Sequence, residues 1–174
     1  MKHCISFLTV IALGCGLTAC DDNATIAPSG TSTSSFTATL LPANEVPPIT
    51  GSEAGGSGTA TIAFNLTNDS AGYATAATMD VTVNVTGFPA GTALTQSHIH
   101  PGAAGANGGV IVSLGLSAGE VNFPTGSGSF SKQGITLTVD QANTILANPG
   151  GFYLNIHTAA NPNGVARGQL TRTQ

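Results

Sequence analysis

The chain has 174 residues and a formal net charge of −4, and only 7% of its residues are charged. Soluble proteins usually contain about 25% charged residues, so the polarity of this surface must come from Thr, Ser, Asn and Gly. Nucleic-acid binding requires clustered cations. Four lysines and arginines in the whole chain exclude that class of partner.

Residues 1–19 have the features of a bacterial lipoprotein signal peptide. They combine a short basic start with an apolar run from Ile5 to Leu17, which is too short to span a bilayer. The run ends in the letters LTAC at 17–20, which resemble the lipobox, the pattern in which the cysteine is acylated and becomes the first mature residue. An ordinary cleavable signal or an uncleaved anchor is the alternative.

Lipidation at Cys20 predicts a location in the bacterial cell envelope. Acyl chains would anchor the protein to membrane lipid, with the domain facing the periplasm or the exterior. All three cysteines, Cys4, Cys15 and Cys20, belong to this leader, so the folded part has neither a disulfide nor a cysteine metal ligand. Residues 20–34 are interpreted as lipidated Cys20 and a flexible tether rich in Ser and Thr, and residues 35–174 as one β domain.

Alternation of apolar and polar residues predicts β strands throughout the domain. The pattern is clearest over 79–86, where Met and Val alternate with Asp, Thr and Asn, as expected for a sheet with one buried face. Further strands are predicted at 36–40, 60–66, 94–100, 109–114, 127–131, 134–139, 151–158 and 165–172.

One short helix is predicted at 141–147, with Asp140 as its cap and Asn148-Pro149-Gly150 as its end. Eight or nine short antiparallel strands separated by Gly, Pro and Asn indicate an all-β fold. We therefore expect a Greek-key β-sandwich or barrel with a single short helix.

Beyond the leader, histidine occurs only as His98, His100 and His157. Residues at i and i+2 of a strand share a face, so His98 and His100 point the same way while Ile99 enters the core. If the strand containing His157 lies beside theirs, three imidazoles converge on one solvent-facing surface and could hold copper or zinc. The alternative is a structural role, in which the imidazoles bind backbone carbonyls of the 101–109 loop.

Arg167 is one of few cations in the domain, and Glu45 is a candidate partner for it. A guanidinium–carboxylate pair between them would join distant parts of the chain through bidentate hydrogen bonds. The competing hypothesis is that Arg167 guides an anion toward a bound metal. Nucleophilic catalysis has little support, because the domain has no cysteine, no Gly-x-Ser-x-Gly sequence and no triad-like arrangement.

Three segments resemble the CHRD domain, which is named after the animal protein chordin and also occurs alone in exported bacterial proteins. They are NEVPP at 44–48, SHIHPGAA at 97–104, and YLNIHT at 153–158 continuing through PNGVARGQL at 162–170. The resemblance extends over about 35–172 and implies an exported single β domain. In chordin, such domains belong to a secreted antagonist of growth factors, so a non-enzymatic binding or surface module is expected. Its partner would be an extracytoplasmic protein or a polysaccharide.

A weaker resemblance connects the histidines to copper–zinc superoxide dismutases, which are Greek-key barrels with a His-x-His pair, a later copper-binding histidine and a nearby arginine. By position, His98, His100, His157 and Arg167 match these residues. A zinc site, a bridging histidine and the disulfide of those enzymes have no counterpart here. The alternative function is therefore a copper-binding or copper-only dismutase-like protein, with copper as its cofactor.

Overall fold

The computed structural model describes residues 29–174. The predicted signal peptide, the predicted lipidation site at Cys20 and the first part of the predicted tether lie outside these residues. Within the described range, no helix combines the length and the apolar character needed to cross a bilayer.

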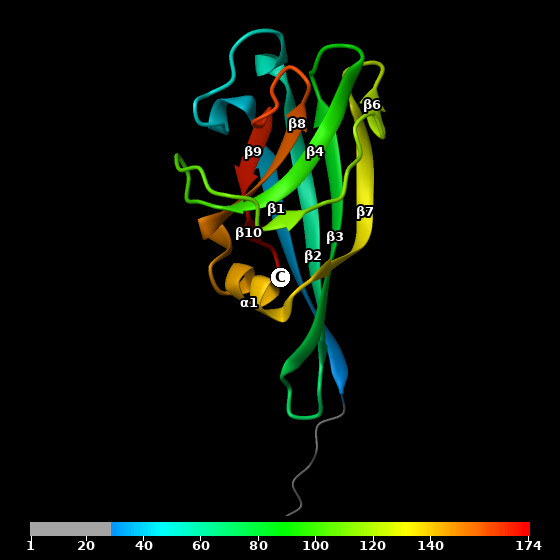
Figure 1. Ribbon diagram of the computed structural model, residues 1–174, viewed down its shortest axis with the longest axis vertical. Coiled ribbons are helices and arrows are strands. Elements are labelled where there is room, and N and C mark those ends of the chain that lie inside the picture. The colour runs from blue at the N-terminus through cyan, green and yellow to red at the C-terminus, as the bar shows by residue number, and fades with distance from the viewer. Residues whose placement is uncertain (1–28) are drawn as a thin grey trace, which may run out of the picture.

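Two antiparallel sheets pack face to face (Figure 1). The first sheet has the strand order β10-β1-β2-β3-β7, and the second has the order β5-β4-β8-β9 with β6 paired to β4. The strands of the first sheet are β1 (Gly30–Leu40), β2 (Ser57–Asn68), β3 (Ala74–Thr86), β7 (Gly128–Leu137) and β10 (Thr171–Arg172). Those of the second are β4 (Thr92–Pro101), β5 (Val112–Ser113), β6 (Val121–Phe123), β8 (Phe152–Thr158) and β9 (Ala166–Gln169). The predicted all-β sandwich is confirmed.

The core lies between the two sheets and follows the predicted alternation. On β3, Met79, Val81 and Val83 are at most 1% exposed, whereas the residues between them face outward. Phe36 of β1 and Phe64 of β2 pack edge to face, with ring centroids 5.5 Å apart. Burying one such side chain contributes about 1.5–3 kcal/mol, so this inner layer supplies much of the stability of the fold.

Several strand boundaries differ from the prediction. β1 begins at Gly30, ahead of the expected domain boundary at 35, and pairs with β2 along its whole length. The segments 127–131 and 134–139 merge into one strand, β7, because a register shift opposite β3 absorbs the irregularity at Gly134. The strand ends at Leu137, and Thr138 and Val139 of the predicted strand instead begin the helix. There the Asp80 carboxylate accepts a hydrogen bond from the Gly134 N–H, and Gly134 has a φ of 65°. Only Val112–Ser113 of the segment 109–114 forms a strand.

The predicted helix is confirmed, but its cap is a different residue. The helix α1 spans Val139–Ala147 and begins at the N-cap Thr138. The Thr138 hydroxyl accepts from the Gln141 N–H, and the Gln141 side chain accepts from the Thr138 N–H, which forms a capping box. The prediction that Asp140 caps the helix was therefore wrong. Within residues 29–174, three short 3-10 helices complete the fold: η1 (Pro42–Asn44), η2 (Ser52–Gly55) and η3 (Pro149–Gly151).

The strand β8 is buried along its entire length, in contrast to the alternating strands of the first sheet. One of its faces packs on the core. Segments on the other side cover its outer face: the loop after β4, the 41–56 segment and the loop between β8 and β9 (Figure 1). The outer face of β8 is therefore enclosed, and its polar side chains lie away from bulk water.

A close contact between β9 and β1 generates the first prediction. A Cβ at Gly168 would clash with the backbone carbonyl of Thr39, whereas one at Gly109 would meet no atom within 4 Å. We expect Gly168→Ala to lower the free energy of unfolding by about 2 kcal/mol or more, because backbone must move to admit the methyl group. Urea denaturation of this variant beside Gly109→Ala measures the effect. Equal stability of the two variants would contradict the packing described.

Candidate metal centre

The three histidines come together because β4 and β8 are neighbouring antiparallel strands. Their register places His98 opposite Asn155, and His157 opposite Gln96. One nitrogen from each of His98, His100 and His157 lies within 4.8 Å of the others. The closest pair of ring centroids, His98 and His157, is 4.9 Å apart. The expectation that these strands lie side by side with converging imidazoles is confirmed.

The surface around these rings is not solvent-facing, which corrects the sequence-based expectation. His100 and His157 are 7% and 4% exposed, and Asn155 between the strands is 2% exposed. The alternation of side chains along a strand correctly identified the face that the histidines share, but it gives no information about the segments that cover this face. Here the loop after β4 and the loop between β8 and β9 cover it, and only His98 keeps partial exposure.

Backbone carbonyls determine the tautomers of two rings. His100 Nδ1 is 2.9 Å from Gly108 O, and His157 Nδ1 is 2.9 Å from Pro162 O. A carbonyl oxygen can only accept, so each Nδ1 donates, and Nε2 of a neutral ring carries the lone pair. Metal-bound histidines commonly have this arrangement, in which the second nitrogen orients the ring. The same bonds also hold the covering loops, so the structural role considered from the sequence is compatible with a ligand role.

The Asn155 side chain lies at the centre of the cluster. Its Oδ1 is 3.2 Å from His100 Nε2 and 2.9 Å from His157 Nε2, and His98 Nδ1 is 3.1 Å from His157 Nε2. An amide oxygen facing two imidazole lone pairs is unfavourable unless a cation lies among them or the amide is reversed. Strand parity places Asn155 on the histidine face, but nothing in the sequence singled it out as a possible ligand.

Burial keeps the imidazoles in the form that binds metals. Burial, with smaller effects of the adjacent His157 and His100, lowers the pKa of His98 to about 4. Burial also lowers the pKa of His157, partly opposed by its hydrogen bond to Pro162. Both rings are consequently neutral near pH 7, and neutral imidazole is the ligand that copper and zinc bind.

Arg167 does not form the predicted ion pair with Glu45. Instead its Nε donates to Asn44 O at 2.6 Å, and its Nη1 donates to Ala106 O at 3.0 Å and to Asn107 Oδ1 at 2.9 Å. Among residues 29–174, the ion pair found within 4 Å joins Lys132 and Glu120. Oxygen atoms of η1 and of the loop after β4 accept from Nε and Nη1, so Arg167 joins these two segments to β9.

Arg167 also supports the ring of His100 through an aromatic stack. Its guanidinium carbon lies 4.3 Å from the centroid of the Tyr153 ring, which in turn stacks on His100 at 5.0 Å and 7°. Arg167 is 1% exposed, and its Nη2 is buried without a hydrogen-bond partner. Arg167 and Glu45 also line a pocket of about 490 Å³, and the anion-guiding role stays a prediction.

Glu45 is the second unusual acid–base group of this region. Burial raises its pKa to about 7, although the nearby positive charge of Arg167 acts in the opposite direction. Its Oε1 is buried and has no hydrogen-bond partner. A carboxyl group in such surroundings holds its proton more tightly than it does in water.

The comparisons with known proteins identify one family. The family model described as the CHRD domain matches residues 36–170. No curated protein and no solved structure matches the chain.

The raised pKa of Glu45 makes its contribution to stability depend on pH. The folded protein holds this proton more tightly than the unfolded chain, whose ordinary value is 4.5. The stabilising contribution is therefore complete below pH 4.5 and is lost as the pH rises through about 7. Relative to Glu45→Gln, we expect the wild-type protein to lose stability over this window, as measured by urea unfolding at several pH values.

Because the wild type and Glu45→Gln share the same histidines, the difference between their stabilities removes the histidine contributions. These contributions change with pH in the opposite direction, because the folded-state pKa values of His98 and His157 are lowered. The control is Glu120→Gln, which removes the same charge from an exposed ion pair. A difference between wild type and Glu45→Gln that stays constant with pH would refute the assignment.

Proposed function

The chain belongs to the CHRD domain family, and on that premise we propose that it is a non-enzymatic binding module of the bacterial cell envelope that holds a copper ion at His98, His100 and His157. Acylated Cys20 anchors it to membrane lipid, and the domain contacts an extracytoplasmic protein or polysaccharide. The observation that carries the metal proposal is the convergence of the imidazole nitrogens within 4.8 Å of one another.

The spacing of the nitrogens fits one ion. A metal about 2.1 Å from each nitrogen holds its ligands roughly 3–4 Å apart, so the rings need to close by about an ångström or less. His98, which is partly exposed, has room to make this adjustment. The Asn155 Oδ1 already faces the same point and supplies a fourth ligand of neutral charge.

Copper is the proposed metal because of the ligand set and its charge. Three neutral imidazoles suit copper and zinc, and divalent copper binds a given nitrogen site more tightly than zinc. No carboxylate belongs to the three-histidine group. The bound ion would supply a positive charge among the lone pairs of His100 and His157, which removes their repulsion with the Asn155 oxygen.

The arrangement supports binding rather than dismutase-like catalysis. Arg167 directs its hydrogen bonds to protein oxygens and supports the Tyr153 ring beneath His100. It is therefore a positioning residue. Loops cover the rings of His100 and His157, which suits retention of an ion better than rapid exchange of a substrate.

Copper binding by the purified protein tests this proposal. Wild-type protein dialysed against Cu(II) should retain one equivalent, with nitrogen ligands visible by electron paramagnetic resonance. Each of His98→Gln, His100→Gln and His157→Gln should weaken binding by more than about 100-fold, since losing a direct ligand exceeds the 10–100-fold loss typical of outer partners.

The matched control is Gln96→Ala, at an exposed position of β4, the strand that contains His98 and His100. Circular dichroism should show that all variants remain folded. Equal copper content in wild type and the histidine variants would refute the site. Preferential retention of zinc from an equimolar mixture would refute copper as the metal and leave the site intact.

The anchor is tested separately by Cys20→Ser. Loss of the acylated sulfur should move the protein from the membrane fraction to the soluble exported fraction and abolish labelling with a fatty acid, because acyl chains supply the membrane affinity. Cys15→Ser is the control, since it alters a cysteine within the leader without touching the lipidation site. Membrane association of Cys20→Ser equal to that of wild type would contradict lipidation.

A further inference from the structure

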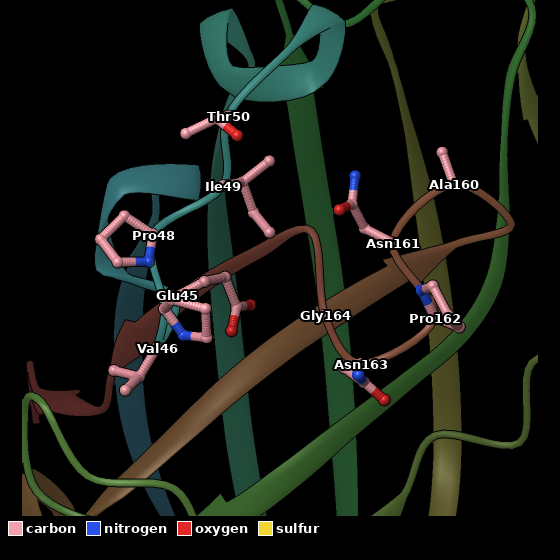
Figure 2. Close-up of a pocket in the computed structure, with 11 residues that line it drawn as sticks. Glu45, Val46, Pro48, Ile49, Thr50, Ala160, Asn161, Pro162, Asn163 and Gly164 are labelled. Carbon is pink, nitrogen blue, oxygen red and sulfur yellow. The ribbon is translucent and has the colours of Figure 1, made fainter.

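A pocket of about 360 Å³ lies between the 45–50 segment and the loop 160–164 (Figure 2). It is separate from the three-histidine cluster. In Figure 2 the carboxyl group of Glu45 points from the 45–50 segment toward the opposite loop, beside Gly164. This placement is tight, because a Cβ at Gly164 would lie 2.7 Å from Glu45 Oε1.

Glu45 is the buried polar residue of this pocket that has an unpartnered side-chain atom. The residue is 6% exposed, and its Oε1 is buried without a hydrogen bond. Among residues 29–174, no ion pair to its carboxyl group is found either. The other buried acid nearby, Glu53, differs in this respect, since its Oε2 accepts from Thr158 Oγ1 and from Asn161 Nδ2. A buried carboxyl group without partners is unfavourable, and a ligand that supplies donors would relieve this cost.

The wall beside Glu45 is apolar. Val46, Pro47, Pro48 and Ile49 line one side of the pocket, and Val46 remains 36% exposed. Across the pocket, the loop contributes Asn161, Pro162 and Asn163. A fitting ligand therefore has an apolar stem that contacts the wall and a polar head that reaches the carboxyl group.

We propose that this pocket binds an alkylammonium group, the head of lysine side chains and of free aliphatic amines. The ammonium donates to the Glu45 carboxylate, while the methylene stem lies against the 46–49 wall. Hydrogen bonds between two charged groups are about twice as strong as those between neutral ones. The formal net charge of −4 also attracts cations to this protein.

Arg167 does not itself form an ion pair with the Glu45 carboxyl group. It is near enough to influence Glu45 electrostatically, but its Nε and Nη1 donate to Asn44, Ala106 and Asn107. Its Nη2 lacks a hydrogen-bond partner but forms no ion pair within 4 Å with Glu45, so the carboxyl group remains free to accept from a ligand. The pocket does not depend on copper, so failure of the metal proposal would leave this inference standing, and the reverse holds too.

Amide chemical shifts of the ¹⁵N-labelled protein, followed by nuclear magnetic resonance, test the proposal. Butylammonium should cause saturable shifts confined to residues 45–50 and 160–164. Glu45→Gln should weaken this binding by about tenfold or more, because it removes the charge of the acceptor. Glu120→Gln is the matched control, as it removes an equal charge from an exposed position outside the pocket, and it should bind like wild type.

Butanol, with the same stem and a neutral head, separates charge recognition from simple apolar contact and should bind more weakly. A short peptide containing one lysine is compared with butylammonium, and the tighter of the two identifies the natural source of the amine. Equal binding of butanol and butylammonium, unchanged binding in Glu45→Gln, or no saturable shift at all would each overturn the proposal. The last result would indicate that an internal water molecule satisfies Glu45.

Discussion

The pairing of β4 with β8 is the constraint on which the site depends. Side chains of a strand alternate between its two faces, so a slip of one residue would turn every imidazole of one strand to the opposite face. The observed register sets His98 opposite Asn155 and His100 opposite Tyr153. Apolar residues of the same strands, including Ile99 and Leu154, fill the core and thereby fix this register. The packing of the sandwich and the geometry of the cluster consequently have one cause.

Burial beneath the covering loops shifts the pKa values of several polar residues in this region. The two loops exclude water, which lowers the pKa of His98 and His157 and raises that of Glu45. Arg167 holds this cover in place by donating to Asn44 and to the loop after β4, and it stacks on Tyr153. Arg167 thus stabilises the cover whose burial of His98 and His157 keeps these two rings neutral. Few charges are available in this chain, and this one is used for structure.

The loop between β8 and β9 connects the two proposed binding regions. Its Pro162 carbonyl orients His157, while Asn161, Pro162 and Gly164 also line the pocket beside Glu45. The neutral imidazoles suit a transition-metal ion, whereas the unpartnered carboxyl group suits an organic cation. The two proposals thus assign two different positive ligands to neighbouring regions of a protein with negative net charge.

Periodicity and parity in the sequence were sufficient for the fold class, most strands, the short helix and the shared face of the three histidines. These features are local, because alternation and i, i+2 spacing depend only on strand geometry. Tertiary structure alone decided four other features: the covering loops, the partners of Arg167, the central position of Asn155 and the isolation of Glu45. Each of them depends on residues far apart in the chain, such as Asn44 with Arg167 and Gly108 with His100. Burial and hydrogen-bond partners across such separations arise only when the sheets and loops pack together, so no local pattern records them.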